Sequence, residues 1–285
     1  MQDPYDISTI PQAFYDSEFY ANSTTMKDAE ELSHFRATIA TFLNYSYDSI
    51  VEFAKHEKDL RQLTSEQKAL LMVDTKSKMA ELLKATQANA EFLTDIAGEH
   101  MDLFEIPEDG NIVFDVSASN RSKIKTLLRQ FNREWALGGA HEREQAFAPI
   151  LAELSRVYPQ SEDVSVLIPG CGLGRLPYEI AKLGFDAQGN EFSYIMLLGS
   201  NYILNNSAHQ RTIYPFAHKF TNNKLYSKNL MPVEVPDVHI GGLPEHVHFS
   251  MVAGEFVDVY GKSAEAWDCI ITCFFIDTAK NVLEY

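Results

Sequence analysis

The fold is decided by residues 164–175, Val164-Ser-Val-Leu-Ile-Pro-Gly-Cys-Gly-Leu-Gly-Arg175. Four of the first five residues are apolar, which is typical of a buried parallel strand. Gly170, Gly172 and Gly174 follow at alternate positions and let the backbone approach a ligand where a Cβ atom would clash. Apolar residues at helical spacing over 173–183 then predict a helix. Strand, glycine turn and helix predict the first half of a nucleotide-binding βαβ unit.

The spacing of these glycines distinguishes two classes of cofactor. The dinucleotide fingerprint G-x-G-x-x-G needs glycine at position 175, where this chain has Arg175. The pattern G-x-G-x-G is instead common in methyltransferases that use S-adenosylmethionine (SAM). Glu191 follows Gly170 at the distance expected of a carboxylate that accepts ribose hydroxyls. We therefore expect SAM, and the alternatives are a nicotinamide cofactor or a glycine turn without a ligand.

Composition argues against several classes of protein. The 285 residues include 40 acidic and 24 basic side chains, a net charge of −16, which disfavours non-specific binding to nucleic acid or to anionic membranes. Neither a membrane span nor a signal peptide is expected. An odd number of cysteines favours a reducing compartment, the cytoplasm or also the nucleus. We expect Cys171, Cys269 and Cys273 to be buried thiols and not metal ligands.

The chain is expected to divide into four segments. The last contains the glycine loop and a long insertion at residues 206–246, whose four prolines and lack of a sustained period are typical of lids and substrate loops. Because fewer strands are predicted than such a sheet usually has, this domain is expected to be incomplete at its carboxyl end. The segments are a polar arm over 1–27, a helical domain over 28–110, helices that close the cofactor site over 111–160, and an α/β SAM-binding domain over 161–285.

Helical periodicity predicts four helices before the glycine loop. Thr64 and Gln67 form a predicted capping box at the start of the second, and Gly138-Gly139 separates the third from the fourth. The first two are expected to pack as an α-hairpin, with partner binding as the alternative. The four predicted helices span residues 28–56, 64–100, 122–137 and 141–158.

Polar residues stand at the ends of the predicted strands. Gly170, Glu191, Glu255 and Asp277 each fall at such an end. Ligands of open α/β sheets bind outside the carboxyl ends of the strands, so we expect these four residues to converge on one site. Ser193 is expected to cap the helix after the second strand. The predicted strands span residues 164–168, 184–189, 248–253 and 267–276.

Five histidines in or beside the insertion raise the question of a metal site. None has the H-x-x-x-H spacing of a helical zinc site, although the last two would share one face of a strand. We therefore expect no metal. The five are His209, His218, His239, His246 and His248.

With these motifs in place, the chain resembles the carnosine N-methyltransferase family from about residue 28 to the end. The most specific matches are Pro169-Gly-Cys-Gly-Leu-Gly-Arg175 and Gln188-Gly-Asn-Glu191. The other matching stretches are Gln130-Phe-Asn-Arg-Glu-Trp135, His141-Glu-Arg-Glu144, Met251-Val-Ala-Gly-Glu-Phe256 and Asp268-Cys-Ile-Ile-Thr-Cys-Phe-Phe-Ile-Asp-Thr278.

The resemblance implies a Rossmann-like SAM methyltransferase sheet with a helical N-terminal domain. It also implies methylation of the imidazole of a histidine-containing dipeptide, carnosine, to give anserine. Gln130 and Arg133 would reach the methionine part of SAM, whose carboxylate suits a guanidinium. Phe274 and Asp277 would bind the substrate. The positions expected to bind SAM are Gln130, Arg133, Gly170, Gly172, Gly174, Glu191, Glu255, Phe256 and Cys273.

Asp277 is the expected catalytic residue. Neutral imidazole is a competent nucleophile near pH 7. A carboxylate that accepts the N–H of one ring nitrogen would leave the lone pair of the other facing the methyl group and would stabilise the imidazolium product. Alignment of the reacting atoms should supply most of the rate enhancement, and no metal is needed.

Two departures from the family pattern bear on activity. Lys280 stands where the family often has a histidine. The substrate pocket is also expected to draw a histidine and tyrosines from a carboxyl-terminal third that lies beyond residue 285. These departures keep two alternatives open: a non-catalytic or truncated SAM-binding or interaction protein, and a methyltransferase acting on histidine in peptides or proteins. The oligomeric state, including a homodimer, is left open as well.

Overall fold

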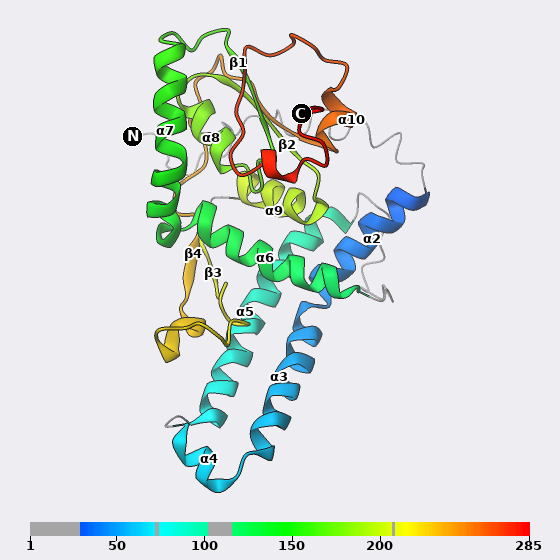
Figure 1. Cartoon of the computed structure of the whole chain (residues 1–285), viewed down its shortest axis with the longest axis vertical. Helices are drawn as coiled ribbons and strands as arrows, with labels where there is room; N and C mark the ends of the chain where they lie inside the picture. Colours follow the sequence, from blue (N-terminus) through cyan, green and yellow to red (C-terminus); the bar gives the residue numbers. More distant parts are fainter. Residues whose placement is uncertain (1–28, 72–73, 102–115, 207–208) are drawn as a thin grey trace. The chain divides into compact units, whose positions relative to one another are not determined.

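The computed structural model describes residues 29–71, 74–101, 116–206 and 209–285 (Figure 1). The predicted polar arm over 1–27 lies outside them. The chain divides into two compact units, which we describe separately. The sheet unit contains residues 29–33, 130–210 and 236–285, and the helical unit contains 34–129 and 211–235.

The sheet unit is built on four parallel strands in the order β5-β2-β1-β6. β1 (Ser165–Pro169) pairs with β2 (Asp186–Glu191) on one side and with β6 (Cys269–Ile270) on the other. β5 (Phe249–Ala253) pairs with the far side of β2. The parallel pairing with helices in the crossovers confirms the predicted Rossmann-like α/β fold.

The predicted strand at the glycine loop is confirmed as β1. Val166, Leu167 and Ile168 are each no more than 1% exposed. Such a continuous apolar run is typical of a strand covered on both faces. The loop after β1 leads into α8 (Arg175–Lys182), and β2 is followed by α9 (Tyr194–Asn205).

The prediction of a long fourth strand over 267–276 was wrong. β6 covers only Cys269 and Ile270, and ladder bonding ends with the donation from Ile271 N to Leu167 O at 2.9 Å. The chain turns away at Phe274, which has a positive φ of 56°, and a 3₁₀ turn, η7 (Ile276–Thr278), follows. An apolar run can continue into a turn whose side chains are mostly exposed, as at Phe274 and Ile276, so composition could not show where the pairing ends.

Two further predicted helices are confirmed before β1. They are α6 (Ala118–Trp135) and α7 (Ala140–Val157), separated by the 3₁₀ turn η5 (Leu137–Gly139). A Cβ atom at Gly139 would overlap the backbone carbonyl of Arg133, so only glycine fits where the chain leaves α6. α6 contributes residues to both units.

The helical unit differs from the predicted pair of long helices. The first is interrupted at Asn44, between α2 (Ala29–Leu43) and α3 (Tyr45–Gln62). The second consists of α4 (Ser65–Leu70) and α5 (Thr75–Met101), with α4 at the tip between α3 and α5 (Figure 1). None of the helices in the described ranges is long and apolar enough to cross a membrane.

The predicted capping box is confirmed at the start of α4. Thr64 Oγ1 accepts a hydrogen bond from Gln67 N at 3.2 Å, and Gln67 Oε1 accepts one from Thr64 N at 2.9 Å. The two residues satisfy each other's exposed N–H groups. The motif correctly locates the start of a helix, but this helix has only six residues.

Part of the predicted insertion has regular structure and belongs to the helical unit. β3 (Arg211–Ile213) and β4 (Val233–Val235) form an antiparallel pair, and the 3₁₀ turn η6 (Tyr226–Leu230) lies between them. The fully buried Asn89 of α5 bonds both backbone groups of Tyr214, accepting from its N at 2.7 Å and donating to its O at 3.0 Å. Three-residue strands are too short to give a periodic signal, which is why the pattern did not reveal them.

Candidate cofactor site at the glycine loop

The three glycines of the loop are required by conformation and by space. Gly170, Gly172 and Gly174 have φ values of 65°, 59° and 80°, in the left-handed region that other residues adopt at a cost. A Cβ atom at Gly170 would overlap the ring of Phe275, and one at Gly172 would lie 2.6 Å from Glu134 Oε1. The loop is therefore shaped for close approach of neighbouring groups, which here are the side chains of Phe275 and Glu134.

Glu191 lies at the carboxyl end of β2 and faces the loop. Its Oε2 accepts a hydrogen bond from Gly172 N at 3.0 Å, and its Oε1 accepts from Phe192 N at 2.9 Å and Ser193 N at 2.8 Å. Burial raises the pKa of this carboxyl group. Ser193 holds the N-cap position of α9 as predicted, but its side chain makes no capping bond. Glu191 binds the free N–H groups there instead.

Glu134 of α6 is the main residue that sequence reasoning missed. It is 4% exposed, and its carboxylate accepts hydrogen bonds from Leu173 N at 3.1 Å and from Arg175 N at 3.2 Å. Gln130, one helical turn earlier, donates to Glu134 Oε1 at 2.5 Å. Burial raises the pKa of Glu134 to about 7 despite these bonds. The signals were its place in the matching stretch 130–135 and its four-residue spacing from Gln130, and this spacing equally suits an exposed helix face.

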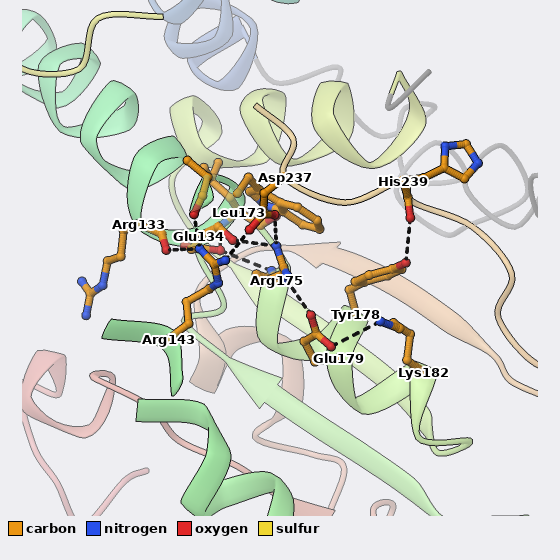
Figure 2. A network of polar contacts seen from close by, with 12 residues as sticks. Arg133, Glu134, Arg143, Leu173, Arg175, Tyr178, Glu179, Lys182, Asp237 and His239 are labelled. Carbon is orange, nitrogen blue, oxygen red and sulfur yellow. Dashed lines mark hydrogen bonds and ion pairs between the residues drawn. The ribbon is translucent and has the colours of Figure 1, made fainter. Parts of the chain in front are cut away.

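Arg175 ties the loop to the rest of the sheet unit. Its guanidinium is buried and donates to Asp237 Oδ1 at 2.6 Å, to Glu134 O at 3.0 Å and to Glu179 Oε1 at 2.7 Å (Figure 2). Arg143 of α7 binds the other oxygen of Asp237. The sequence identified Arg175 only as a missing glycine, whereas it connects α8 to α6 and to the segment after β4.

Gln130 lies at the glycine loop, and Arg133 lies near a predicted substrate residue. The guanidinium of Arg133 is 4.7 Å from the ring centroid of Phe274, and Arg133 Nε is 2.8 Å from Glu142 Oε1. Figure 2 shows the side chain of Arg133 pointing away from the carboxylate of Glu134. The structure thus places Arg133, a predicted SAM contact, next to Phe274, a predicted substrate contact.

Glu255 and Asp277 are not tied to the loop. Glu255 caps α10 (Phe256–Tyr260), where its Oε2 accepts from Asp258 N at 2.9 Å, and Asp277 is exposed in η7. Within the described residues, no hydrogen bond or ion pair joins either carboxylate to the glycine loop. Phe256 packs on Phe275, with 5.5 Å between ring centroids. Because the ring of Phe275 lies against Gly170, Phe275 separates Phe256 from the glycine loop.

The cysteines are only partly as expected. All three are free thiols, and Cys171 is buried in the glycine loop, but Cys269 and Cys273 are partly exposed. Burial raises the pKa of the Cys273 thiol. Across the ranges that the structure describes, no group of three or more His, Cys, Asp or Glu side chains could hold a metal ion.

A second polar cluster lies in the helical unit. Glu52 Oε2 is 2.5 Å from Lys125 Nζ and 3.0 Å from His218 Nδ1, and His218 Nε2 is 2.9 Å from the hydroxyl of Tyr45. Burial opposes ionisation of Glu52, but the bonds with His218 and Lys125 outweigh it and lower its pKa to about 2. These residues line a cavity of about 440 Å³. His218, one of the five histidines considered for a metal site, therefore pairs with the carboxylate of Glu52.

Comparison with known proteins identifies the family. Residues 111–285 match the family model described as carnosine N-methyltransferase. The mouse (Mus musculus) carnosine N-methyltransferase is 36% identical over 273 residues, covering 92% of this chain and 68% of that protein. The Schizosaccharomyces pombe protein of that name is 34% identical over 271 residues, 90% of this chain and 73% of that protein. This chain therefore belongs to the carnosine N-methyltransferase family.

Proposed function

We propose that this protein is a SAM-dependent methyltransferase that transfers a methyl group to the imidazole of carnosine and so forms anserine. The observation that carries the proposal is the glycine loop of β1, held against the carboxylate of Glu191 at the end of β2. This arrangement occurs in a chain whose relatives are named carnosine N-methyltransferase. The names of those relatives supply the substrate, and the loop supports the cofactor class.

The residues around the loop fit SAM. Gly170 and Gly172 lack Cβ atoms, which lets Phe275 and Glu134 lie directly against the loop, and Glu191 presents a fixed carboxylate suited to ribose hydroxyls. Gln130 and Arg133 would hold the methionine part, the guanidinium facing its carboxylate. When bound, SAM supplies a methyl group on a positively charged sulfur atom.

Phe274 and Asp277 are the proposed substrate contacts. Phe274 is 68% exposed and Asp277 is exposed as well, so both side chains are accessible to a small molecule. Asp277 would accept the N–H of one imidazole nitrogen and thereby fix the tautomer that leaves the other nitrogen's lone pair free. Phe274 would pack against the imidazole ring, next to the guanidinium of Arg133.

The test is mass spectrometry of carnosine incubated with SAM and the protein. We expect the dipeptide to gain one methyl group. Competition with histidine-containing peptides separates the two enzyme hypotheses, since faster methylation of peptides would replace carnosine as the substrate. Absence of any methylated product, with SAM bound, would contradict the proposed reaction.

Asp277→Asn sharpens this test. The variant keeps the size of the side chain and removes the charge that stabilises the imidazolium product, so methyl transfer should slow while SAM affinity stays nearly unchanged. Glu284→Gln is the matched control, because it removes a carboxylate seven residues away in the same exposed segment. An Asp277→Asn enzyme that transfers methyl groups at the wild-type rate would remove Asp277 from the catalytic role.

A further inference from the structure

We infer that Glu134 makes the glycine loop selective for a positively charged cofactor. Its carboxylate fills the position at the amino end of α8 where other glycine loops bind an anionic phosphate group. This inference rests on the proposed use of SAM and deepens it, because it assigns the charge preference of the loop to one residue.

The hydrogen bonds of the loop support the claim that Glu134 takes the place of a phosphate group. The amino end of a helix attracts anions because its first N–H groups lack partners within the helix. Here the N–H groups of residues 171–175 all have acceptors inside the protein. Leu173 N and Arg175 N donate to Glu134, Gly172 N donates to Glu191, and the other two donate to backbone oxygens. A phosphate group would find these donors already used.

The neighbours of Glu134 support the claim that the loop prefers a positively charged cofactor. Its side chain bonds two backbone N–H groups and the amide of Gln130, all of them uncharged. Arg175 gives its side-chain bonds to Asp237, Glu179 and a backbone oxygen. No ion pair reaches the Glu134 carboxylate from within the described residues.

No cation among the described residues forms an ion pair with the Glu134 carboxylate, although the neighbouring Arg133 attracts it electrostatically. Burial disfavours the ionised form more strongly than the hydrogen bonds and the attraction of Arg133 favour it, so the pKa is raised to about 7. A cation bound beside the loop would stabilise the carboxylate and would itself be stabilised, because the interaction is mutual and the site is buried. The sulfonium of SAM is such a cation. S-Adenosylhomocysteine, the neutral product left after methyl transfer, lacks that charge.

This difference in charge gives a test that does not depend on turnover. Calorimetric titration would give the dissociation constants of SAM and S-adenosylhomocysteine for the wild type and for Glu134→Gln. Glutamine keeps an oxygen that can accept the loop N–H groups. We expect SAM affinity to fall by roughly tenfold and S-adenosylhomocysteine affinity to change by less than about twofold. In the wild type, the preference for SAM should also rise with pH through about 7, and it should not do so in the variant.

Glu179→Gln is the matched control. It removes a carboxylate from the polar network of Arg175 but leaves the loop N–H groups untouched, so the ratio of the two affinities should stay at the wild-type value. Equal weakening of both ligands by Glu134→Gln would show a merely structural role and overturn the inference. Failure of the wild type to bind either ligand would instead overturn the proposed use of SAM.

Discussion

Two carboxylates, the partly exposed Glu52 of the helical unit and the buried Glu134 of the sheet unit, differ in what surrounds them. Glu52 of the helical unit bonds Lys125 and His218, and its pKa is lowered to about 2. Glu134 of the sheet unit bonds only uncharged groups, and its pKa is raised to about 7. The first charge is balanced within the protein and stabilises the packing of its neighbours. The second has no ion-pair partner among the described residues, and perturbed pKa values of this kind cluster at functional sites.

The largest effect should come from filling the space beside Glu134. Gly172→Val adds a side chain where a Cβ atom would already lie 2.6 Å from Glu134 Oε1, at a φ of 59°. Because β-branched residues strongly disfavour this conformation, the loop should distort and SAM binding should fall below detection in a calorimetric titration.

Gly98→Ala is its control in the helical unit. Gly98 is exposed within α5, and a Cβ atom there would meet nothing within 4 Å. Alanine should therefore stabilise the helix by about 0.5–1 kcal/mol and leave SAM affinity unchanged. If Gly172→Val bound SAM with wild-type affinity, the glycine loop would not be the SAM site.

The next effect is the opposite pH dependence of the two carboxylates. A raised pKa means that the stabilising contribution of Glu134 is full below its ordinary value of 4.5 and is lost as pH rises through about 7. Relative to Glu134→Gln, the wild type should therefore lose about 3 kcal/mol of unfolding free energy across this range. Denaturant unfolding followed by fluorescence of Trp135, which is fully buried in the sheet unit, measures it.

For Glu52 the sign is reversed. Its contribution is present above the ordinary value of 4.5 and is lost as pH falls through about 2. Relative to Glu52→Gln, the wild type should lose stability on acidification, as followed by far-ultraviolet circular dichroism of the helices. If the contributions of Glu134 and Glu52 to the free energy of unfolding changed with pH in the same direction, the proposed difference between the two carboxylates would be wrong.

The smallest effect should be the loss of the Glu52 ion pairs at neutral pH. Glu52→Gln leaves Lys125 without its partner, and we expect a destabilisation of about 1–2 kcal/mol, limited because the side chain of Glu52 is 29% exposed. Hydrogen exchange of the α3 amides would measure it.

The control is the pair of Glu57 with Arg61 on the same helix. Its side chains are 46% and 75% exposed, so Glu57→Gln should cost less than about 0.5 kcal/mol. Neither substitution should change SAM affinity. A fall in SAM affinity in Glu52→Gln would show that the helical unit takes part in cofactor binding.

The parts of the structure that follow from local pattern were predictable. The strand before the glycines, the loop itself, the position of Glu191 and the two helices before β1 all appear as expected. Each depends on residues within a few positions of one another. Backbone conformation and hydrophobic periodicity determine such elements directly.

The features that depend on distant residues were not predictable. β6 ends after two residues where the chain turns at Phe274, and residues 211–235 pack with α5 through Asn89. Glu134 has the sequence context of an ordinary helix residue, and only folding places its carboxylate against Leu173, 39 positions later. Contacts across such separations leave no periodic signal.

A crystal structure of the protein with S-adenosylhomocysteine would test the central claim most directly. The account predicts that the ligand lies along Gly170–Gly174, with its ribose hydroxyls bonded to the carboxylate of Glu191. Ligand in the cavity beside Glu52 and His218, or elsewhere away from the glycine loop, would contradict it.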